Sequence, residues 1–132
     1  YLFGVTAAEM PASFAEEALK AQAVAARTYT VRMMSRRASN RYDVVDTTSD
    51  QVYRGTPSGN ANCVTAIDST RGIVLQYGGE YVMTYYSASN GGETESAPHG
   101  VIITTAGPYS ISSELSFCEN LIKTSIKNII NI

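Results

Sequence analysis

The sequence predicts an α+β fold in which a long Ala-rich helix and a shorter helix pack on a small, mainly antiparallel sheet. Three observations carry this prediction. An Ala-rich segment with three- and four-residue apolar spacing follows Pro11, a shorter helix-like segment follows Asn60, and two β-branched and aromatic runs flank Gly78-Gly79. The chain has 132 residues, 44% of them hydrophobic. A chain of this length buries roughly two-thirds of its unfolded surface around one core.

The long helix is predicted from Phe14 to about Met34. Ser13 stands three residues before Glu16, which is the spacing of a capping box at a helix start. Apolar and small side chains then recur at helical spacing, at Phe14, Ala18, Ala21, Ala25 and Tyr29. The many alanines indicate that another element approaches this helix closely.

A polar loop over residues 35–49 and a brief strand over Gln51–Tyr53 are predicted next. A second, shorter helix is expected from Ala61 to Ser69, with Asn60 as its N-cap and Gly72 just beyond its end. Its buried face would carry Cys63, Val64 and Ile67. The runs Ile73–Tyr77 and Glu80–Ser87 then form a hairpin around Gly78-Gly79.

Composition narrows the class of partner. Ten Lys and Arg residues against twelve Asp and Glu residues give a formal net charge of -2, and no strong basic cluster is present. This balance argues against nucleic acid as a partner. No apolar run approaches the ~18 residues of a membrane span. Cys63 and Cys118 fit neither a redox pair nor a zinc knuckle, so they are either two buried thiols or, in an exported protein, a disulfide.

Glu9 is the most informative acid. Apolar residues surround it in the segment GVTAAEMP, so the sequence predicts partial burial, which disfavours an ionised carboxylate and raises its pKa. A Glu that stays protonated near neutral pH can act as a general acid. From spacing alone, an ordinary surface acid is the other interpretation.

Two further polar segments allow two interpretations each. Lys20 and Arg27 lie seven residues apart on one face of the long helix, as a binding surface or as a solvated stripe. The loop over residues 87–92 either binds sugar hydroxyls or simply turns the chain. His99 is the only histidine, and no nucleophile elbow, reactive-cysteine context or phosphate loop accompanies it. Triad chemistry is therefore not expected.

Four segments resemble, in the right order, the signature blocks of the SpoIID/LytB domain family. They read YLFGVTAAEMPASFAEEALKAQAVAARTYTV at residues 1–31, followed by YDVVDTTSDQVYRG, STRGIVLQYGG and YYSASNGGETE. We therefore expect a SpoIID/LytB-like domain over residues 1–109. The tail over residues 110–132 does not match and has the apolar spacing of a helix.

The resemblance implies a lytic transglycosylase that cleaves peptidoglycan glycan strands already freed of their stem peptides. Glu9 matches the catalytic Glu of the family and would act as general acid and base. Because the muramic acid 6-hydroxyl closes a 1,6-anhydro ring, the second carboxylate of an ordinary glycosidase is not needed. The matched substrate-binding positions are Lys20, Gln22, Arg27, Tyr29, Gln51, Tyr53, Tyr86, Ser87, Ser89, Gly91 and Gly92.

Neither a metal nor another cofactor is expected, because the positions of a zinc site found in some members read Val45, Ser49 and Asp50. The implied partners are glycan strands and an N-acetylmuramoyl-L-alanine amidase. The implied location is extracytoplasmic, at the cell wall or the forespore-engulfment membrane face, with any targeting segment outside this sequence. The alternative function is a non-catalytic glycan-binding module that enhances a partner amidase.

Overall fold

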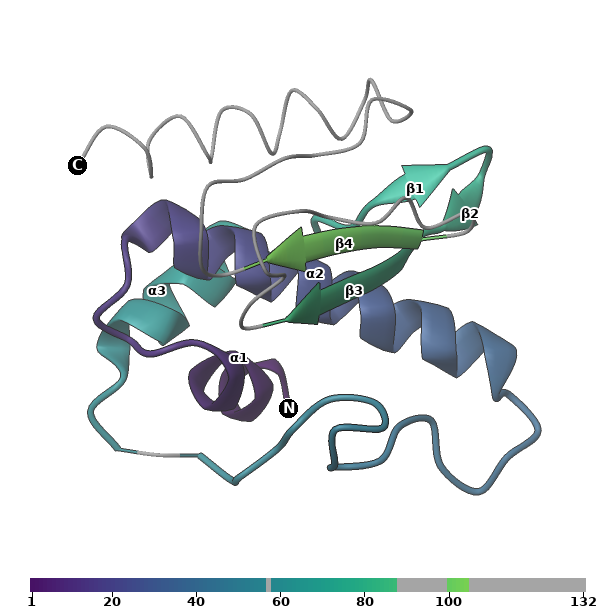
Figure 1. Cartoon of the computed structure of the whole chain (residues 1–132), viewed down its shortest axis with the longest axis horizontal. Coiled ribbons are helices and arrows are strands. Elements are labelled where there is room, and N and C mark those ends of the chain that lie inside the picture. The colour runs from purple at the N-terminus through teal and green to yellow at the C-terminus, as the bar shows by residue number, and fades with distance from the viewer. Residues whose placement is uncertain (57, 88–99, 105–132) are drawn as a thin grey trace.

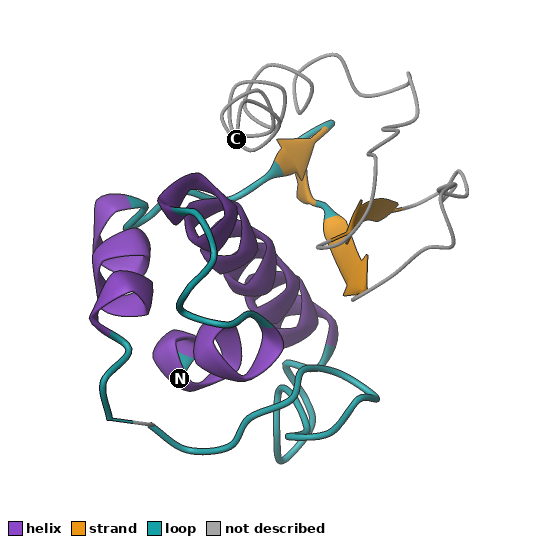
Figure 2. Cartoon of the chain, turned by 60° about the vertical axis from the view of Figure 1, so that its left-hand side comes forward, coloured by secondary structure: helices purple, strands orange, loops and turns teal. Residues whose placement is uncertain are grey.

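A computed structural model describes residues 1–56, 58–87 and 100–104, and its helices and strands confirm the α+β class (Figure 1). The long helix α2 (Glu16–Arg36) is central and contacts α1, α3, β2 and β3. Figure 2 shows α1 (Leu2–Glu9) and α3 (Ala61–Ser69) on one side of α2 and the strands on the other. Among the described residues, none of the helices is long and apolar enough to cross a membrane.

Helix α1 was not predicted from the sequence. Its N-cap, Tyr1, makes no side-chain capping bond, and Gly4 costs about 1 kcal/mol relative to Ala in a helix. Local propensity is therefore weak, and packing against α2 and α3 stabilises the helix. The helix ends before Pro11, because proline disfavours a helical conformation in the residue preceding it, and Met10 is extended (φ -139°, ψ 127°).

Helix α2 starts later than predicted, and the expected capping box is wrong. Ala15 is the N-cap, without a side-chain capping bond, and the first helical residue is Glu16. The reason is a turn over Pro11–Phe14, closed by the Phe14 N–H donating to the Pro11 carbonyl (3.0 Å), which contains Ser13. The helix also runs on to Arg36, so the predicted loop begins two residues later than expected.

The second predicted helix is confirmed over its full span as α3. Asn60 is at the N-cap position but makes no side-chain capping bond. The buried face is carried by Cys63 and Ala66, whereas Val64 is 43% exposed, so the prediction was wrong for Val64.

The hairpin is confirmed in a shorter form. Strand β1 (Gln76–Tyr77) pairs antiparallel with β2 (Glu80–Tyr81), and Gly78 and Gly79 both have positive φ (57° and 83°), as the tight turn requires. The chain then continues into β3 (Met83–Ser87), which pairs in parallel with β4 (Gly100–Thr104). The strand predicted over Gln51–Tyr53 is wrong, because this segment belongs to no ladder in the described structure.

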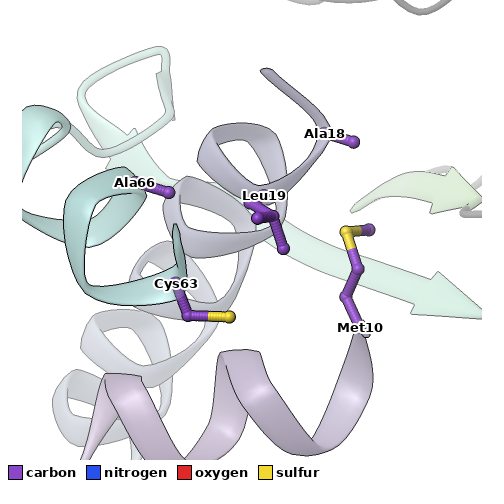
Figure 3. Close-up of a cluster of buried hydrophobic side chains, with 5 residues drawn as sticks. All are labelled: Met10, Ala18, Leu19, Cys63 and Ala66. Atoms are coloured by element: carbon purple, nitrogen blue, oxygen red, sulfur yellow. The ribbon is translucent and has the colours of Figure 1, made fainter. Parts of the chain in front are cut away.

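The core lies where the three helices meet. The α1 end, α2 and α3 enclose a cluster of buried side chains (Figure 3), namely Met10, Ala18, Leu19, Cys63 and Ala66. Cys63 has no disulfide partner among the described residues, and burial raises the pKa of its thiol, which agrees with the interpretation as a buried small side chain. Cys118 and the predicted tail over residues 110–132 lie outside the described residues.

Candidate active site

Glu9 is the last residue of α1 and is half-buried. Its Oε1 atom accepts a hydrogen bond from the Val52 N–H at 2.8 Å. Within the described structure its Oε2 atom has no hydrogen-bond partner. One oxygen of the carboxyl group is therefore anchored to the backbone, and the other has no partner among the described residues.

The side chain of Gln51, the residue before Val52, is completely buried and makes hydrogen bonds through both its amide oxygen and its amide nitrogen. Its Oε1 accepts from the Tyr1 hydroxyl (3.1 Å) and the Thr30 hydroxyl (2.8 Å). Its Nε2 donates to the Ala26 carbonyl (3.2 Å) and the Tyr86 hydroxyl oxygen (3.1 Å). Gln51 thus joins α1, α2 and β3 by hydrogen bonds.

Tyr86 and Tyr1 are protonated phenols near Glu9. Burial raises the pKa of Tyr86, and the negative charge of Glu9 raises it further, whereas the Gln51 hydrogen bond lowers it; the net shift is upward. Burial also raises the pKa of Tyr1, with a smaller contribution of the same sign from Glu9. Both side chains therefore remain neutral hydrogen-bonding groups at physiological pH.

Asp50, the residue before Gln51, is anchored to the long helix by its side chain. Its side chain is 1% exposed and accepts hydrogen bonds from Arg37 (2.6 and 3.2 Å), the Tyr29 hydroxyl (2.9 Å) and the Val45 N–H (2.8 Å). Burial by itself would raise the pKa of Asp50, but these donors outweigh it and the pKa lies below its usual value. Burial and the Asp50 acceptor raise the pKa of Tyr29.

The acid stability of the protein should therefore depend on Asp50. A carboxyl whose pKa is lower in the folded chain contributes stability that is present above its unfolded pKa, about 3.9, and is lost as pH falls through its folded pKa. We expect the free energy of unfolding to decrease below about pH 5 in the parent protein, and Asp50→Asn to flatten part of this decrease. Urea unfolding, followed by circular dichroism from pH 7 to 3, measures the free energy of unfolding at each pH. Asp68→Asn, at an exposed ion pair, is the control, and an equal acid slope in Asp50→Asn would contradict the assignment.

The contacts of the Asp50 carboxyl group also bear on whether residues 45–50 could bind a zinc ion. Both Asp50 oxygens already accept hydrogen bonds, Val45 offers only an apolar side chain, and Ser49 a neutral hydroxyl. Zinc in proteins is bound by Cys thiolates, His nitrogens and carboxylates. These residues do not fit a zinc ion, and the described residues contain no group of three or more metal-binding side chains.

Arg27 lies on α2 and its guanidinium group contacts the C-terminal end of α3. It donates to the carbonyls of Ile67 (3.2 Å), Thr70 (2.7 Å) and Ile73 (3.0 Å). These acceptors include carbonyls that a helix end leaves without partners. Burial lowers the pKa of Arg27, yet it remains charged because an arginine pKa starts above 12. The geometry gives Arg27 a structural role, and its predicted glycan contact stays a prediction.

Replacing Arg27 with Met tests these two roles against each other. Loss of the charged donors should lower the free energy of unfolding by about 1.5–3 kcal/mol, because the carbonyls at the α3 end lose a charge-assisted hydrogen bond. Glycan affinity per folded molecule should be unchanged. Denaturant unfolding and a glycan-binding titration measure the two quantities. Arg71→Met, at an exposed ion pair, is the control; weaker glycan binding with unchanged stability would instead support the substrate-binding prediction.

The other predicted positions on α2 do not form one surface. Lys20 pairs with Glu16 (2.7 Å) and Glu17 (2.8 Å), which raises its pKa. Gln22 is buried, and neither of its amide atoms has a hydrogen-bond partner among the described residues. Tyr29 donates to Asp50. The structure thus brings Tyr86 and Gln51 to Glu9 and directs Lys20, Arg27 and Tyr29 to other partners.

The remaining predicted positions are placed as follows. The Tyr53 ring stacks on Tyr1, with centroids 5.8 Å apart and an angle of 16° between the planes. Ser87 is the last residue of β3. Ser89, Gly91, Gly92 and His99 lie outside the described residues.

Three contributors to the site were missed by the sequence analysis: Tyr1, Thr30 and the Val52 N–H. Tyr1 and Thr30 contact a glutamine that lies 50 and 21 residues away in the chain. The Val52 N–H is a backbone group that no side-chain pattern could reveal. The only sequence signal was the Thr30 hydroxyl on the long helix, and a hydroxyl by itself does not indicate which residue it bonds.

A half-buried carboxyl with one anchored oxygen, next to neutral tyrosines, defines a candidate general acid and base site. The chain belongs to the SpoIID family, because the family model described as Stage II sporulation protein matches residues 1–77. The amidase enhancer of Bacillus subtilis (strain 168) is 44% identical over 113 residues, covering 86% of this chain and 15% of that protein. Stage II sporulation protein D of the same organism is 36% identical over 124 residues, covering 83% of this chain and 36% of that protein. The chain thus spans well under half the length of these relatives.

Proposed function

We propose that this chain is a peptidoglycan lytic transglycosylase that cuts the bond between N-acetylmuramic acid and N-acetylglucosamine in glycan strands freed of stem peptides. The observation that carries the proposal is the Glu9 carboxyl group. Its Oε1 is held by the Val52 N–H, and its Oε2 has no partner among the described residues. A carboxyl fixed in this way can present one oxygen to a reacting atom without losing its orientation. Membership of the SpoIID family supports a cell-wall substrate.

The proposed reaction needs one acid. Protonated Glu9 donates its proton to the glycosidic oxygen as the bond from that oxygen to muramic acid C1 breaks. The muramic acid 6-hydroxyl oxygen then bonds to C1, and its proton passes to the ionised Glu9 carboxylate. The products are a 1,6-anhydro end and a free N-acetylglucosamine hydroxyl, and Glu9 is protonated again. Water is not consumed, so no second carboxylate is required to activate it.

Product analysis tests the reaction. The purified chain is incubated with glycan strands that an amidase has stripped of peptides, and the fragments are analysed by mass spectrometry. We expect fragments with anhydro-muramic ends. Fragments that have gained one water at a reducing end would overturn the transglycosylase chemistry, and intact strands would overturn the activity.

A second candidate function is a non-catalytic glycan-binding module that stimulates an N-acetylmuramoyl-L-alanine amidase. The similarity to the amidase enhancer of Bacillus subtilis favours it. The two functions differ in what Glu9 does. A binding module would still bind glycan and stimulate an amidase after Glu9→Gln, and the parent chain would release no anhydro-muramic products. Both functions place the protein outside the cytoplasm, at the cell wall or the forespore-engulfment membrane face.

A further inference from the structure

Residues 50–52 connect the long helix to Glu9 through three successive contacts. Asp50 is held by Arg37 and Tyr29. Gln51 is held by α2 through the Ala26 carbonyl, and the next residue, Val52, donates its N–H to Glu9. The position of the Glu9 carboxyl group is therefore set by how residues 50 and 51 attach to α2.

The Ala26 carbonyl favours one orientation of the Gln51 amide in this network. A primary amide has two N–H donors and one oxygen with two lone pairs. Both donors are used here, and the oxygen lies within hydrogen-bond distance of the Tyr1 and Thr30 hydroxyls. The Ala26 carbonyl can only accept a hydrogen bond. A flipped amide would bring the Gln51 oxygen against that carbonyl oxygen, 3.2 Å from it, with no proton of the amide between them. The Thr30 hydroxyl lies 2.8 Å from both the Ala26 carbonyl and Gln51 Oε1, so these two oxygens share its single proton.

The fixed amide determines the direction of the Tyr86 hydroxyl group. Because Gln51 Nε2 donates to the Tyr86 oxygen, the hydroxyl proton of Tyr86 must point to another acceptor. Within the described residues that proton has no acceptor. Tyr86 remains protonated, because burial and the charge of Glu9 both raise its pKa. The site therefore holds a neutral O–H donor in the electrostatic field of Glu9.

We propose that Gln51 is a positioning residue, which does not touch the glycan but orients the Tyr86 hydroxyl toward a substrate oxygen beside Glu9 and fixes the Val52 N–H that holds Glu9. This inference deepens the proposed function and rests on it. It replaces the expectation that Gln51 lines a glycan-binding surface, because the Gln51 side chain is 0% exposed. The ligand group is an oxygen acceptor, such as a sugar hydroxyl or an acetamido carbonyl.

Gln51→Glu tests the inference with a side chain of the same shape. The new side chain has no N–H to donate, and the single proton of its buried carboxyl group is taken by the Ala26 carbonyl, which can only accept. Tyr86 should therefore turn its proton toward residue 51 and away from the substrate. We expect kcat on stripped glycan strands to fall about 10- to 100-fold with KM nearly unchanged. Tyr86→Phe should lower kcat by a similar factor, and the double variant should be no worse than either single one. A higher KM at unchanged kcat would overturn the inference in favour of direct glycan binding.

A spectroscopic measurement separates this inference from the proposed activity. The Cζ resonance of Tyr86, in protein with carbon-13-labelled tyrosine and assigned by Tyr86→Phe, should shift in Gln51→Glu without any substrate. The matched control is Thr84→Val, which removes a buried donor to the neighbouring Ala25 carbonyl (2.7 Å) on the same helix, and it should leave that resonance in place. An unshifted Tyr86 signal in folded Gln51→Glu would reject the positioning role, even if the parent protein cuts glycan. If Gln51→Glu does not fold, Gln51→Met serves the same measurement.

Discussion

Replacing Glu9 with Gln is expected to lower the rate of glycan cleavage by about 100- to 10,000-fold, the usual contribution of a general acid and base. The amide oxygen of the new side chain can still accept the Val52 N–H that now lies 2.8 Å from Glu9 Oε1. The side chain therefore keeps its place but has no acidic proton to give. Release of anhydro-muramic products, followed by mass spectrometry, measures the effect, and thermal unfolding should show a fold as stable as the parent.

The control for this variant is Glu16→Gln, which makes the same chemical change at an exposed position in the first turn of α2. It should leave cleavage unchanged. Glu9→Gln should also still bind stripped glycan, because the shape of the site is preserved. Undiminished cleavage in Glu9→Gln would remove Glu9 from the mechanism, whereas loss of binding and stability together would mean that the variant is misfolded.

Replacing Gly4 with Ala is expected to lower both the free energy of unfolding and the rate of glycan cleavage. A methyl group at Gly4 would overlap the Tyr53 ring at its Cε2 and Cδ2 atoms and lie 2.5 Å from the Gly55 carbonyl oxygen. Overpacking of this kind costs about 1–3 kcal/mol or more, while the gain in helix propensity is only about 1 kcal/mol. The net change is destabilising, and it should displace residues 52–55. Cleavage should therefore fall further than the folded fraction does, because the Val52 N–H is part of that segment.

A double-mutant cycle identifies what the methyl group meets. Tyr53→Ala removes the ring but leaves the Gly55 carbonyl in place. If Gly4→Ala is still destabilising in the Tyr53→Ala background, the backbone carbonyl is the main obstacle; if the cost disappears, the ring is. Denaturant unfolding of the four proteins gives both numbers. A Gly4→Ala protein that is as stable as the parent would show that α1 does not pack this closely on residues 53–55.

Local sequence signals predicted those elements whose ends and spacing are encoded within a few residues. Helix α3 was predicted over its full span, and the hairpin at Gly78-Gly79 was predicted from the two residues that form the turn. Helix α1 was missed because it has no capping side chain and includes Gly4, so its stability comes from contacts with α2 and α3. The parallel pairing of β3 with β4 was missed for a related reason, since it joins segments that are not neighbours in the chain.

The candidate site was predicted in part. Glu9, Gln51 and Tyr86 were named from the family resemblance, and the structure brings these three together. The same resemblance also named Arg27 and Tyr29, whose polar atoms contact the end of α3 and the Asp50 carboxylate. A motif lists residue types at given spacings, but it does not say whether a side chain faces a substrate or another helix.

The sequence by itself determined that this chain folds around one long Ala-rich helix, that it belongs to the SpoIID family, and that Glu9 is the candidate acid. Only the tertiary structure decided which groups surround that acid. Hydrogen bonds such as those from Gln51 to Ala26 and from Val52 to Glu9 join residues 25 and 43 positions apart. Their geometry depends on how α1, α2 and residues 50–52 pack in three dimensions, which no short sequence pattern encodes.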